Sequence, residues 1–195
     1  MTRTFRVAAS AALVIMFCVG CEWDAVDPTP DPVGTPEEQW RILMSRPAIE
    51  DAERTIKTAM NEMHDVLGAE FGIELWVQHP SAPPTGWSGC GWDFADVDSR
   101  SAASLYVNGW SARRPVGQDR WSDFVRRFGE IAGRYGFRLA HAGEGTGGRT
   151  VTASNGLDQI EYGGAAAGYL SGRVGCHLLA AAKTAGPPMP AHPTR

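Results

Sequence analysis

The fold is indicated by residues 121–141, which read WSDFVRRFGEIAGRYGFRLAH. Up to residue 135 the apolar residues recur every three or four positions, which is the period of a helix with one buried face. They are Trp121, Phe124, Val125, Phe128, Ile131, Ala132 and Tyr135. After Gly136 the period changes to two, because Phe137, Leu139 and His141 alternate as in a strand. The stretch predicts a helix over about 118–135, a glycine stop, and a strand directly afterwards.

Two further helices are expected before this stretch. Thr35-Pro36-Glu37-Glu38 is a capping box with Pro at the first helical position, which predicts a short helix over about 36–44. A longer helix is expected over about 47–68, where an apolar stripe has helical spacing. The stripe is Ile49, Ala52, Ile56, Met60, Met63 and Leu67. Strands are then expected at about 73–78 and 103–110, separated by a loop rich in Pro and Gly.

The rest of the chain is predicted to be β-structure. Strands are expected at about 149–154, 157–163 and 166–176, and Asn155-Gly156 predicts a two-residue hairpin turn between the first two. Short links between strands favour antiparallel pairing. We therefore expect an α+β fold, with a mostly antiparallel sheet of about five strands and two main helices packed on one face.

The N-terminus has the pattern of an export signal. Arg3 and Arg6 precede an uncharged run from Val7 to Cys21, which is too short to span a bilayer and suits a signal peptide. The run ends at Cys18-Val19-Gly20-Cys21, where a small residue precedes a cysteine, as in a bacterial lipoprotein signal. Cys21 is the predicted lipidation site, because Phe17 before Cys18 is too large for that position. An ordinary secretory signal and an uncleaved anchor are the alternatives.

The chain is thus divided into four segments. A signal peptide over 1–20 is followed by a lipidated, acidic, Pro-rich tether over 21–35, a single α+β domain over 36–180, and a Pro-rich disordered tail over 181–195. Lipidation predicts a protein that is exported and anchored to the outer face of the plasma membrane. The membrane, reached through the lipid on Cys21, is its first expected partner.

Composition and charge exclude several classes of protein. The 195 residues include 7 Trp, 7 Phe and 4 Tyr, which is too much apolar surface for a disordered chain. A single apolar stretch excludes a polytopic membrane protein. Removal of residues 1–20 takes away two basic residues and no acidic one, which leaves a net charge of −6. A mildly acidic chain is not expected to bind nucleic acid.

Two cysteines remain once Cys18 is cleaved off and Cys21 is lipidated. Cys90 and Cys176 are expected to form a disulfide, as thiols of exported domains do. The alternative is a pair of metal ligands, for which His177 is the sole neighbour in sequence.

The motifs that carry catalysis are incomplete in this chain. Gly143 to Gly148 fits a dinucleotide fingerprint, but a strand rather than a helix follows it, so we interpret it as a hairpin loop. Ser88 lacks the glycine and the strand of a nucleophile elbow. Acidic residues at 93, 96 and 98 resemble a calcium loop without its glycine and terminal Glu, and a solvated acidic loop is favoured. His141 and His177 become candidate bases if a carboxylate lies near them, and a histidine satisfied by a structural neighbour is the more common case.

Two aromatic residues and a basic segment are weaker candidates. Trp87 and Trp92 flank Cys90 and are candidate ligand-binding residues if exposed; packing against the disulfide is the favoured interpretation. Residues 113–138 hold seven Arg against three acidic residues, a composition that could contact anionic headgroups. We favour a solvated helix face there, because Asp123–Arg127 and Glu130–Arg134 have the spacing of ion pairs.

Short motifs connect the chain to a known family. The signal ending at Cys21, the dipeptide Gly89-Cys90 and the segment LSGRVGCH at 170–177 resemble those of LppA-type lipoproteins of mycobacteria and related actinobacteria. The excess of Arg over Lys is typical of the GC-rich genomes of that group. The resemblance covers about residues 36–180 and implies a lipid-anchored envelope protein with no assigned activity. It carries lipidation over to Cys21 and the disulfide to Cys90 and Cys176, and it brings no catalytic residue.

The function expected from the sequence is a non-enzymatic binding or structural role in the cell envelope, with no cofactor and no bound metal. The partner would be an envelope lipid, glycan or protein. One alternative is a lipid or glycolipid carrier, which needs an apolar cavity of several hundred Å³ between helices and sheet. The other is an envelope hydrolase, which needs an acid or a serine within hydrogen-bond reach of His141 or His177 in a cleft.

Overall fold

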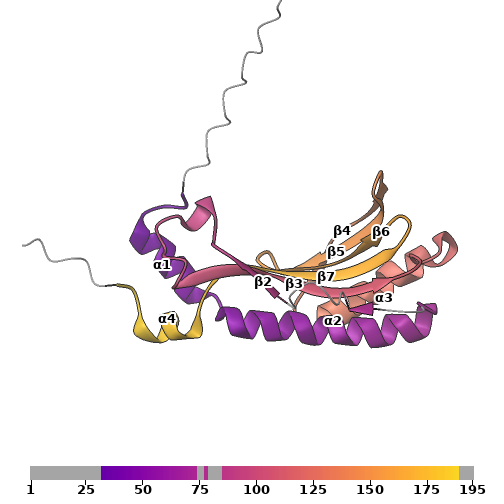
Figure 1. Ribbon diagram of the computed structural model, residues 1–195, viewed down its shortest axis with the longest axis horizontal. Helices are drawn as coiled ribbons and strands as arrows, with labels where there is room; N and C mark the ends of the chain where they lie inside the picture. The colour runs from indigo at the N-terminus through magenta and orange to yellow at the C-terminus, as the bar shows by residue number, and fades with distance from the viewer. Residues whose placement is uncertain (1–31, 74–76, 79–84, 189–195) are drawn as a thin grey trace, which may run out of the picture.

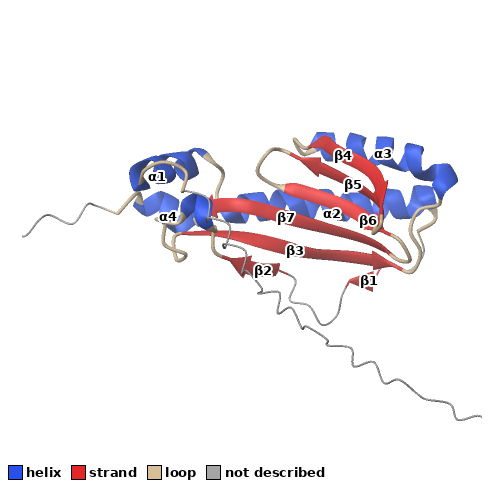
Figure 2. Ribbon diagram, turned by 90° about the horizontal axis from the view of Figure 1, so that it is seen from above, coloured by secondary structure: helices blue, strands red, loops and turns tan. Residues whose placement is uncertain are grey.

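The domain is an antiparallel sheet with two long helices against one face (Figure 1). The computed structural model describes residues 32–73, 77–78 and 85–188. The seven strands are β1 (Val77–Gln78), β2 (Thr85–Ser88), β3 (Ala102–Ala112), β4 (Arg138–Gly145), β5 (Gly148–Ser154), β6 (Gln159–Gly164) and β7 (Gly168–Leu178). Their order is β1-β3-β7-β6-β5-β4, and β2 pairs with β3 on the same side as β1 (Figure 2). The α+β prediction is confirmed.

The main helices form where the periodicity predicts them. Helix α1 (Pro36–Ser45) begins with the predicted capping box, in which Thr35 Oγ1 accepts from the Glu38 amide at 3.3 Å and Glu38 accepts from the Thr35 amide at 2.9 Å. Helix α2 (Ile49–Phe71) ends at Gly72, which takes the left-handed conformation. Helix α3 (Trp121–Arg134) is preceded by a short 3-10 turn, η2 (Gln118–Arg120), so the α-helix starts later than expected. Among the described residues, no helix is both long enough and apolar enough to cross a bilayer.

The main core lies between the sheet and these helices. Helix α2 contributes its predicted stripe, and α3 contributes Phe124, Phe128 and Ile131, all fully buried. From the sheet come Leu105, Val151, Ile160, Leu170 and Val174 among others. The Tyr162 hydroxyl accepts from the Val116 amide at 3.0 Å, which holds the loop between β3 and α3 against the core.

The ion pairs of α3 correct one prediction. Arg127 pairs with Glu70 at 2.9 Å and Arg134 pairs with Glu62, so these arginines join α3 to α2. The expected pairing of Asp123 with Arg127 and of Glu130 with Arg134 is not what the structure contains. Ion pairs within α3 do form, but with other partners, because Glu130 pairs with Arg126 at 2.7 Å and with Arg127 at 3.2 Å.

A second, smaller core covers one end of the opposite face of the sheet. Helix α1 and the 3-10 turn η1 (Trp92–Phe94) pack there (Figure 1). The buried members of this core are Trp40, Leu43, Phe94, Val97, Ala102, Cys176 and Leu178. The buried Gln39 ties the two segments together, because its Nε2 donates to Asp96 Oδ2 at 2.8 Å and its Oε1 accepts from the Asp96 amide at 3.2 Å.

Three details of the prediction are wrong, each because of a long-range contact. The sheet has seven strands instead of about five, because β2 forms within the loop by pairing with β3. The Asn155-Gly156 turn is a four-residue loop over 155–158 instead of a two-residue hairpin, with Ser154 opposite Gln159. The tail predicted to be disordered from 181 is helical at its start, in α4 (Ala180–Ala185), where Lys183 Nζ donates to the carbonyls of Met44 and Arg46. Of the strand predicted at 73–78, residues 74–76 lie outside the described residues.

Candidate functional site

The predicted disulfide is present and closes the small second core. Cys90 and Cys176 are bonded, with 5.1 Å between their Cα atoms. Cys90 follows β2, and Cys176 lies near the end of β7, so the bond fixes the segment that carries η1 to a central strand. Cys21, the signal peptide and most of the tether lie outside the described residues.

His177 has a carboxylate partner, but the pair is buried. Its Nε2 lies 2.9 Å from Asp158 Oδ1, and its Nδ1 lies 3.0 Å from the Pro47 carbonyl. Both ring nitrogens of His177 thus lie within hydrogen-bond distance of an oxygen atom. The His177 side chain is 0% exposed and that of Asp158 is 4% exposed. No substrate reaches such a pair without a change of fold.

Hydrogen bonds keep Asp158 charged in the interior. Burial by itself would raise the pKa of Asp158. The hydrogen bonds from His177 and Asn155, the charge on His177 and the Gly175 amide together hold that pKa below its ordinary value. Asn155 Nδ2 donates to Asp158 Oδ2 at 3.0 Å and the Gly175 amide donates to Oδ1 at 3.0 Å. Asp158 thus joins the 155–158 loop, β7 and the start of α2.

The remaining sequence motifs, namely Ser88, the Gly143–Gly148 segment, the acidic loop and His141, do not form a catalytic or metal site among the described residues. Ser88 Oγ lies 2.8 Å from Ser104 Oγ. The predicted hairpin is confirmed at Gly143–Gly148, where Gly145 faces Gly148 in the β4–β5 pair. Asp98 is held by Arg100 at 2.6 Å, and Asp96 by Gln39. His141 lies exposed on β4, and within the described part of the chain it has no acid or serine in hydrogen-bond reach.

The two tryptophans beside Cys90 do not pack on the disulfide, which corrects the favoured interpretation. Trp87 is 52% exposed and Trp92 is 59% exposed. Phe94 takes the buried place near Cys176 instead, with the Arg46 guanidinium 4.8 Å from its ring centre. Trp87 lies opposite Leu105 in the β2–β3 pair, whereas Trp92 belongs to η1. Both predicted ligand-binding residues are thus exposed, and they come from different elements.

The face of the sheet that points away from α2 and α3 has no helix over it beyond the end where α1 and η1 pack (Figure 1). Residues opposite each other in an antiparallel pair share a face. One row on this face is Gln159, Arg173 and Tyr106, contributed by β6, β7 and β3. The next row is Thr152, Glu161 and Ser171. Both rows are polar, in contrast to the apolar residues that alternate with them in the same strands. We call this surface the open face.

A groove of about 480 Å³ lies in the centre of the open face. It is lined by Tyr106, Gln159, Glu161, Tyr169, Ser171, Gly172 and Arg173. Tyr106 is 46% exposed and Tyr169 is 37% exposed. A smaller hollow of about 340 Å³ adjoins it and shares both tyrosines, which thus form the wall between the two.

Tyr169 is held in place on the sheet. It lies opposite Gly163, and a Cβ at Gly163 would come within 2.8 Å of the Tyr169 hydroxyl, so the glycine makes room for the ring. The hydroxyl donates to Glu161 Oε1 at 2.6 Å. This hydrogen bond, burial and the negative charge of Glu161 raise the pKa of Tyr169 to about 12. The hydrogen bond to Glu161 and the space above Gly163 together set the position of the Tyr169 ring on the sheet.

Arg173 supplies an available positive charge beside the Tyr169 ring. Among the residues that the structure describes, none forms a hydrogen bond or ion pair with its guanidinium. Arg173 also lines a further hollow of about 370 Å³ that runs toward the disulfide and includes Arg46 and Asp93. The groove combines two aromatic rings, a carboxylate, an amide, a hydroxyl and a guanidinium that has no partner among the described residues.

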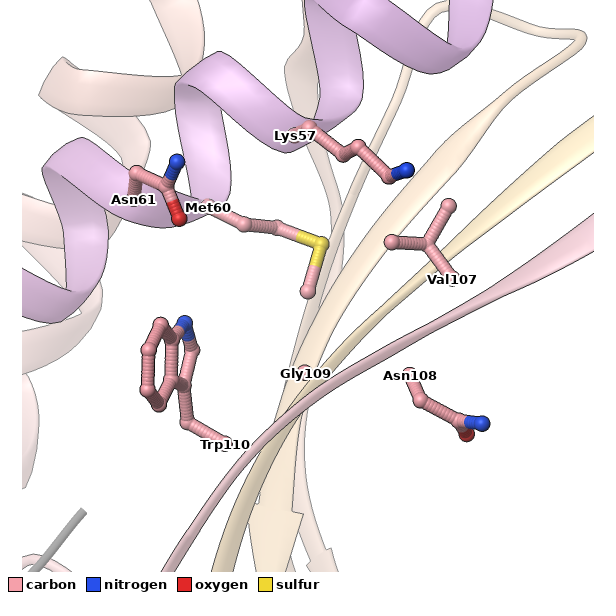
Figure 3. A pocket seen from close by; sticks show the side chains of 7 residues that line it. All are labelled: Lys57, Met60, Asn61, Val107, Asn108, Gly109 and Trp110. Atoms are coloured by element: carbon pink, nitrogen blue, oxygen red, sulfur yellow. The ribbon is translucent and has the colours of Figure 1, made fainter. Parts of the chain in front are cut away.

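A different pocket, of about 380 Å³, lies between α2 and β3 (Figure 3). Met60 and Trp110 point into it, and Lys57 and Asn61 form its rim on α2 (Figure 3). The Trp110 ring lies against the His64 ring at an angle of 31°, with 4.1 Å between the ring centres. β1 and β2 are joined by residues 79–84, which lie outside the described residues, so this pocket is defined only on its α2 and β3 sides. The open face is the better-defined candidate.

The groove residues were missed at the sequence level, although a signal for them exists. Polar or aromatic residues of the groove alternate with apolar residues or glycine along β6 and β7, although Ser171 is itself buried. They are Gln159 and Glu161 in β6, and Tyr169, Ser171 and Arg173 in β7. Alternation identifies residues that share a face. It does not show that the face lacks a covering helix.

Comparison with known proteins gives two matches. A family model described as "LppA: Lipoprotein confined to pathogenic Mycobacterium" matches residues 26–180. The crystal structure of LppA from Mycobacterium tuberculosis aligns with a TM-score of 0.53 at 13% sequence identity, covering 82% of this chain and 94% of that one. At that identity the likeness shows the fold alone. No curated protein matches the chain.

Proposed function

Because this chain belongs to the LppA lipoprotein family, as its sequence resemblance predicted, we propose that it is anchored to the outer face of the plasma membrane through a lipidated Cys21. We further propose that the domain is a binding module rather than an enzyme. Its ligand lies in the groove of the open face, between Tyr106 and Tyr169. The observation that carries this proposal is the Arg173 guanidinium, unpaired within the described residues and set beside two exposed tyrosines in a groove.

The chemistry of the groove favours an acidic oligosaccharide. Aromatic side chains with one exposed ring face stack on other rings, and the hydroxyl of a fixed tyrosine adds direction to the contact. Glu161 and Gln159 offer acceptors and donors for sugar hydroxyls. The Arg173 guanidinium has the planar geometry that pairs with a carboxylate through two parallel hydrogen bonds. A uronic acid unit meets all three requirements.

The alternatives find less support in the geometry. Hydrolysis needs a base in a cleft. Of the two candidate bases predicted from the sequence, His141 and His177, the one with an acid beside it, His177, is buried. Carriage of a lipid needs an apolar cavity between helices and sheet, and that space is filled by Phe124, Phe128 and Ile131, each 0% exposed. Binding of a ligand at a solvated surface needs neither a catalytic base nor an apolar cavity.

The binding proposal is tested with an array of uronic-acid oligosaccharides and matched neutral oligosaccharides, probed with the full chain. We expect binding to the acidic series. Arg173→Gln should weaken binding to the acidic oligosaccharides and reduce the preference for them over the neutral ones. Tyr106→Ala should weaken binding to both series. Trp92→Ala, which removes an exposed aromatic ring outside the groove, is the matched control and should leave binding unchanged. If the unmodified chain binds neither series, or if Trp92→Ala has the same effect as Tyr106→Ala, the proposal is wrong.

The anchor is tested separately by mass spectrometry of the chain purified from its own membrane. We expect a mature chain that begins at Cys21 and carries a diacylglyceryl-sized addition. Cys21→Ser should move the protein from the membrane fraction to the soluble fraction. An unmodified Cys21 in the membrane fraction would mean that another device holds the chain there.

A further inference from the structure

We propose a second binding site, a phosphate-binding pocket at the end of the sheet where β3 and α2 finish. The pocket has a volume of about 450 Å³. It is lined by Phe71, Gly72, Ile73, Arg113, Arg114, Pro115, Val116 and Gly117. Arg113 and Arg114 are exposed, and no described residue forms an ion pair with either.

Two further arginines add positive charge around this pocket. Arg120 lies 4.6 Å over the ring of Phe71 and donates to the Glu70 carbonyl at 3.0 Å. Arg149 Nη2 donates to the Val116 carbonyl at 3.0 Å, and its guanidinium lies 5.7 Å from the Trp121 ring centre. Arg149 Nη1 is buried and has no hydrogen-bond partner within the described part of the chain. An unsatisfied buried donor of this kind is unusual, and a nearby anion would compensate its charge.

The acidic residues nearby do not neutralise the cluster. The Glu70 carboxylate is taken by Arg127, at 2.9 Å from its guanidinium. Glu144 faces Arg149 across the β4–β5 pair, and Asp119 lies in the η2 turn, and neither forms an ion pair with the four arginines. Within the described part of the chain, none of the four arginines has a carboxylate partner. The Asp119 carboxylate lies beside Gly117 in the pocket wall without pairing with any of them.

This arrangement suits a phosphate group more than a single carboxylate. Guanidinium groups bind phosphate oxygens through paired, charge-assisted hydrogen bonds. Two adjacent arginines on one wall match an anion that carries more than one negative charge. The apolar wall of Phe71, Ile73, Pro115 and Val116 lowers the local dielectric, which strengthens the attraction.

The position of the pocket separates it from the groove of the open face and from the N-terminal side of the domain. It lies at the end of α2 that is remote from α1 (Figures 1 and 2). The 23 residues of α2 place about 35 Å of helix between the two ends. A phosphate carried by a soluble or wall-borne molecule reaches this end freely, and a lipid headgroup is the other source of the same chemistry.

The test uses the full chain with Cys21→Ser, so that no lipid contributes, and two probes. Inorganic pyrophosphate is titrated by calorimetry, and vesicles of phosphatidylcholine with phosphatidylglycerol are sedimented with the protein. Arg113→Gln/Arg114→Gln is compared with Arg41→Gln/Arg100→Gln, which removes the same charge from exposed sites on α1 and near Asp98. Circular dichroism shows whether each variant is folded.

We expect saturable pyrophosphate binding that the pocket variant weakens at least about tenfold and the control variant leaves nearly unchanged. Binding to vesicles alone, lost in the pocket variant, also supports the pocket and identifies a lipid as the source of the phosphate. The proposal is overturned if the pocket variant and the control variant lose the same amount of binding. It is also overturned if the chain with both Arg113 and Arg114 intact binds neither pyrophosphate nor the vesicles. Arg173→Gln should not affect pyrophosphate binding, which keeps this site distinct from the groove of the open face.

Discussion

Asp158 Oδ1 and His177 Nε2 lie 2.9 Å apart where both side chains are cut off from solvent. The pair joins the 155–158 loop to β7, and the Pro47 carbonyl on the other ring nitrogen adds the start of α2. A catalytic role would need access, which burial denies. The position of the pair instead indicates that it holds three segments together.

Asp158→Asn should destabilise the domain by about 3–5 kcal/mol, because removal of one partner leaves the other buried and uncompensated. Urea unfolding measures the change in the free energy of unfolding. Asp98→Asn is the control, since Asp98 pairs with Arg100 at the surface and its loss should matter little. Similar stabilities for the two variants would contradict the structural role.

The same residue predicts a loss of stability in acid. The pKa of Asp158 is depressed in the folded protein. Its contribution is therefore complete above the unfolded-state pKa of about 3.9 and disappears as the pH falls through the lower folded value. The melting temperature, measured at intervals from neutral pH downward, should fall less steeply below about pH 4 in Asp158→Asn than in the unmodified chain.

Reduction of the Cys90–Cys176 bond should lower the free energy of unfolding substantially. The two residues are 86 positions apart, and a loop of that length corresponds to about 4–5 kcal/mol in the chain-entropy model. Urea unfolding with and without a phosphine reductant measures it, and intact mass shows a gain of about two hydrogens when the bond is reduced. An unchanged unfolding midpoint would mean that the bond does not restrain the unfolded chain.

The Tyr169–Glu161 hydrogen bond predicts a shifted phenol titration. The carboxylate and its charge disfavour the phenolate, so the pKa of Tyr169 is about 12. Glu161→Gln removes the charge and should lower that pKa toward the usual value of about 10. Ultraviolet absorbance of the phenolate, followed between about pH 9 and 12.5, reports the change. Tyr169→Phe identifies which tyrosine is responsible, and a titration curve that Glu161→Gln does not alter would contradict the assignment.

Two glycine substitutions should have opposite effects. A Cβ at Gly172 would meet Met60 Sδ at 2.8 Å and also the Ile56 side chain, so Gly172→Ala should push α2 from the sheet and destabilise the fold by about 1–3 kcal/mol. Gly133 lies within α3 with open space around it, so Gly133→Ala should stabilise the domain by about 0.5–1 kcal/mol. Thermal melts of the two variants measured side by side test the packing of α2 against β7.

Local pattern predicted those parts of the fold that local interactions decide. The apolar stripes of α2 and α3 and the Thr35 capping box needed no knowledge of distant residues. Strand β2 was missed because a short stretch between glycines and prolines becomes a strand only by pairing with β3. The 155–158 loop differs from a tight hairpin because Asp158 is drawn inward to His177, which is 19 positions away.

The candidate sites show the same division. The partners Cys90 and Cys176 followed from counting cysteines. The groove of the open face depends on which face α2 and α3 cover, and the Arg113–Arg114 pocket depends on where β3 and α2 end together. Neither the covered face of the sheet nor the meeting of these two ends can be predicted from one segment of the sequence alone. The sequence likewise does not show that Phe94, and neither Trp87 nor Trp92, is the aromatic residue buried in the second core.

The link between α1 and the disulfide-bonded segment bears on mechanics. A pull from the N-terminal side of Pro36 reaches the domain at two points, the hydrogen bond that the Val33 amide donates to the Asp93 carbonyl at 2.9 Å and helix α1. Gln39 passes that load to Asp96, and Arg46 passes it to the carbonyl of Cys176 at 2.7 Å. The segment holding Asp96 is itself covalently clamped to β7 by the Cys90–Cys176 bond. Tension applied at the tether would thus be borne by the central strands of the sheet, and the domain would resist extraction from its N-terminal end.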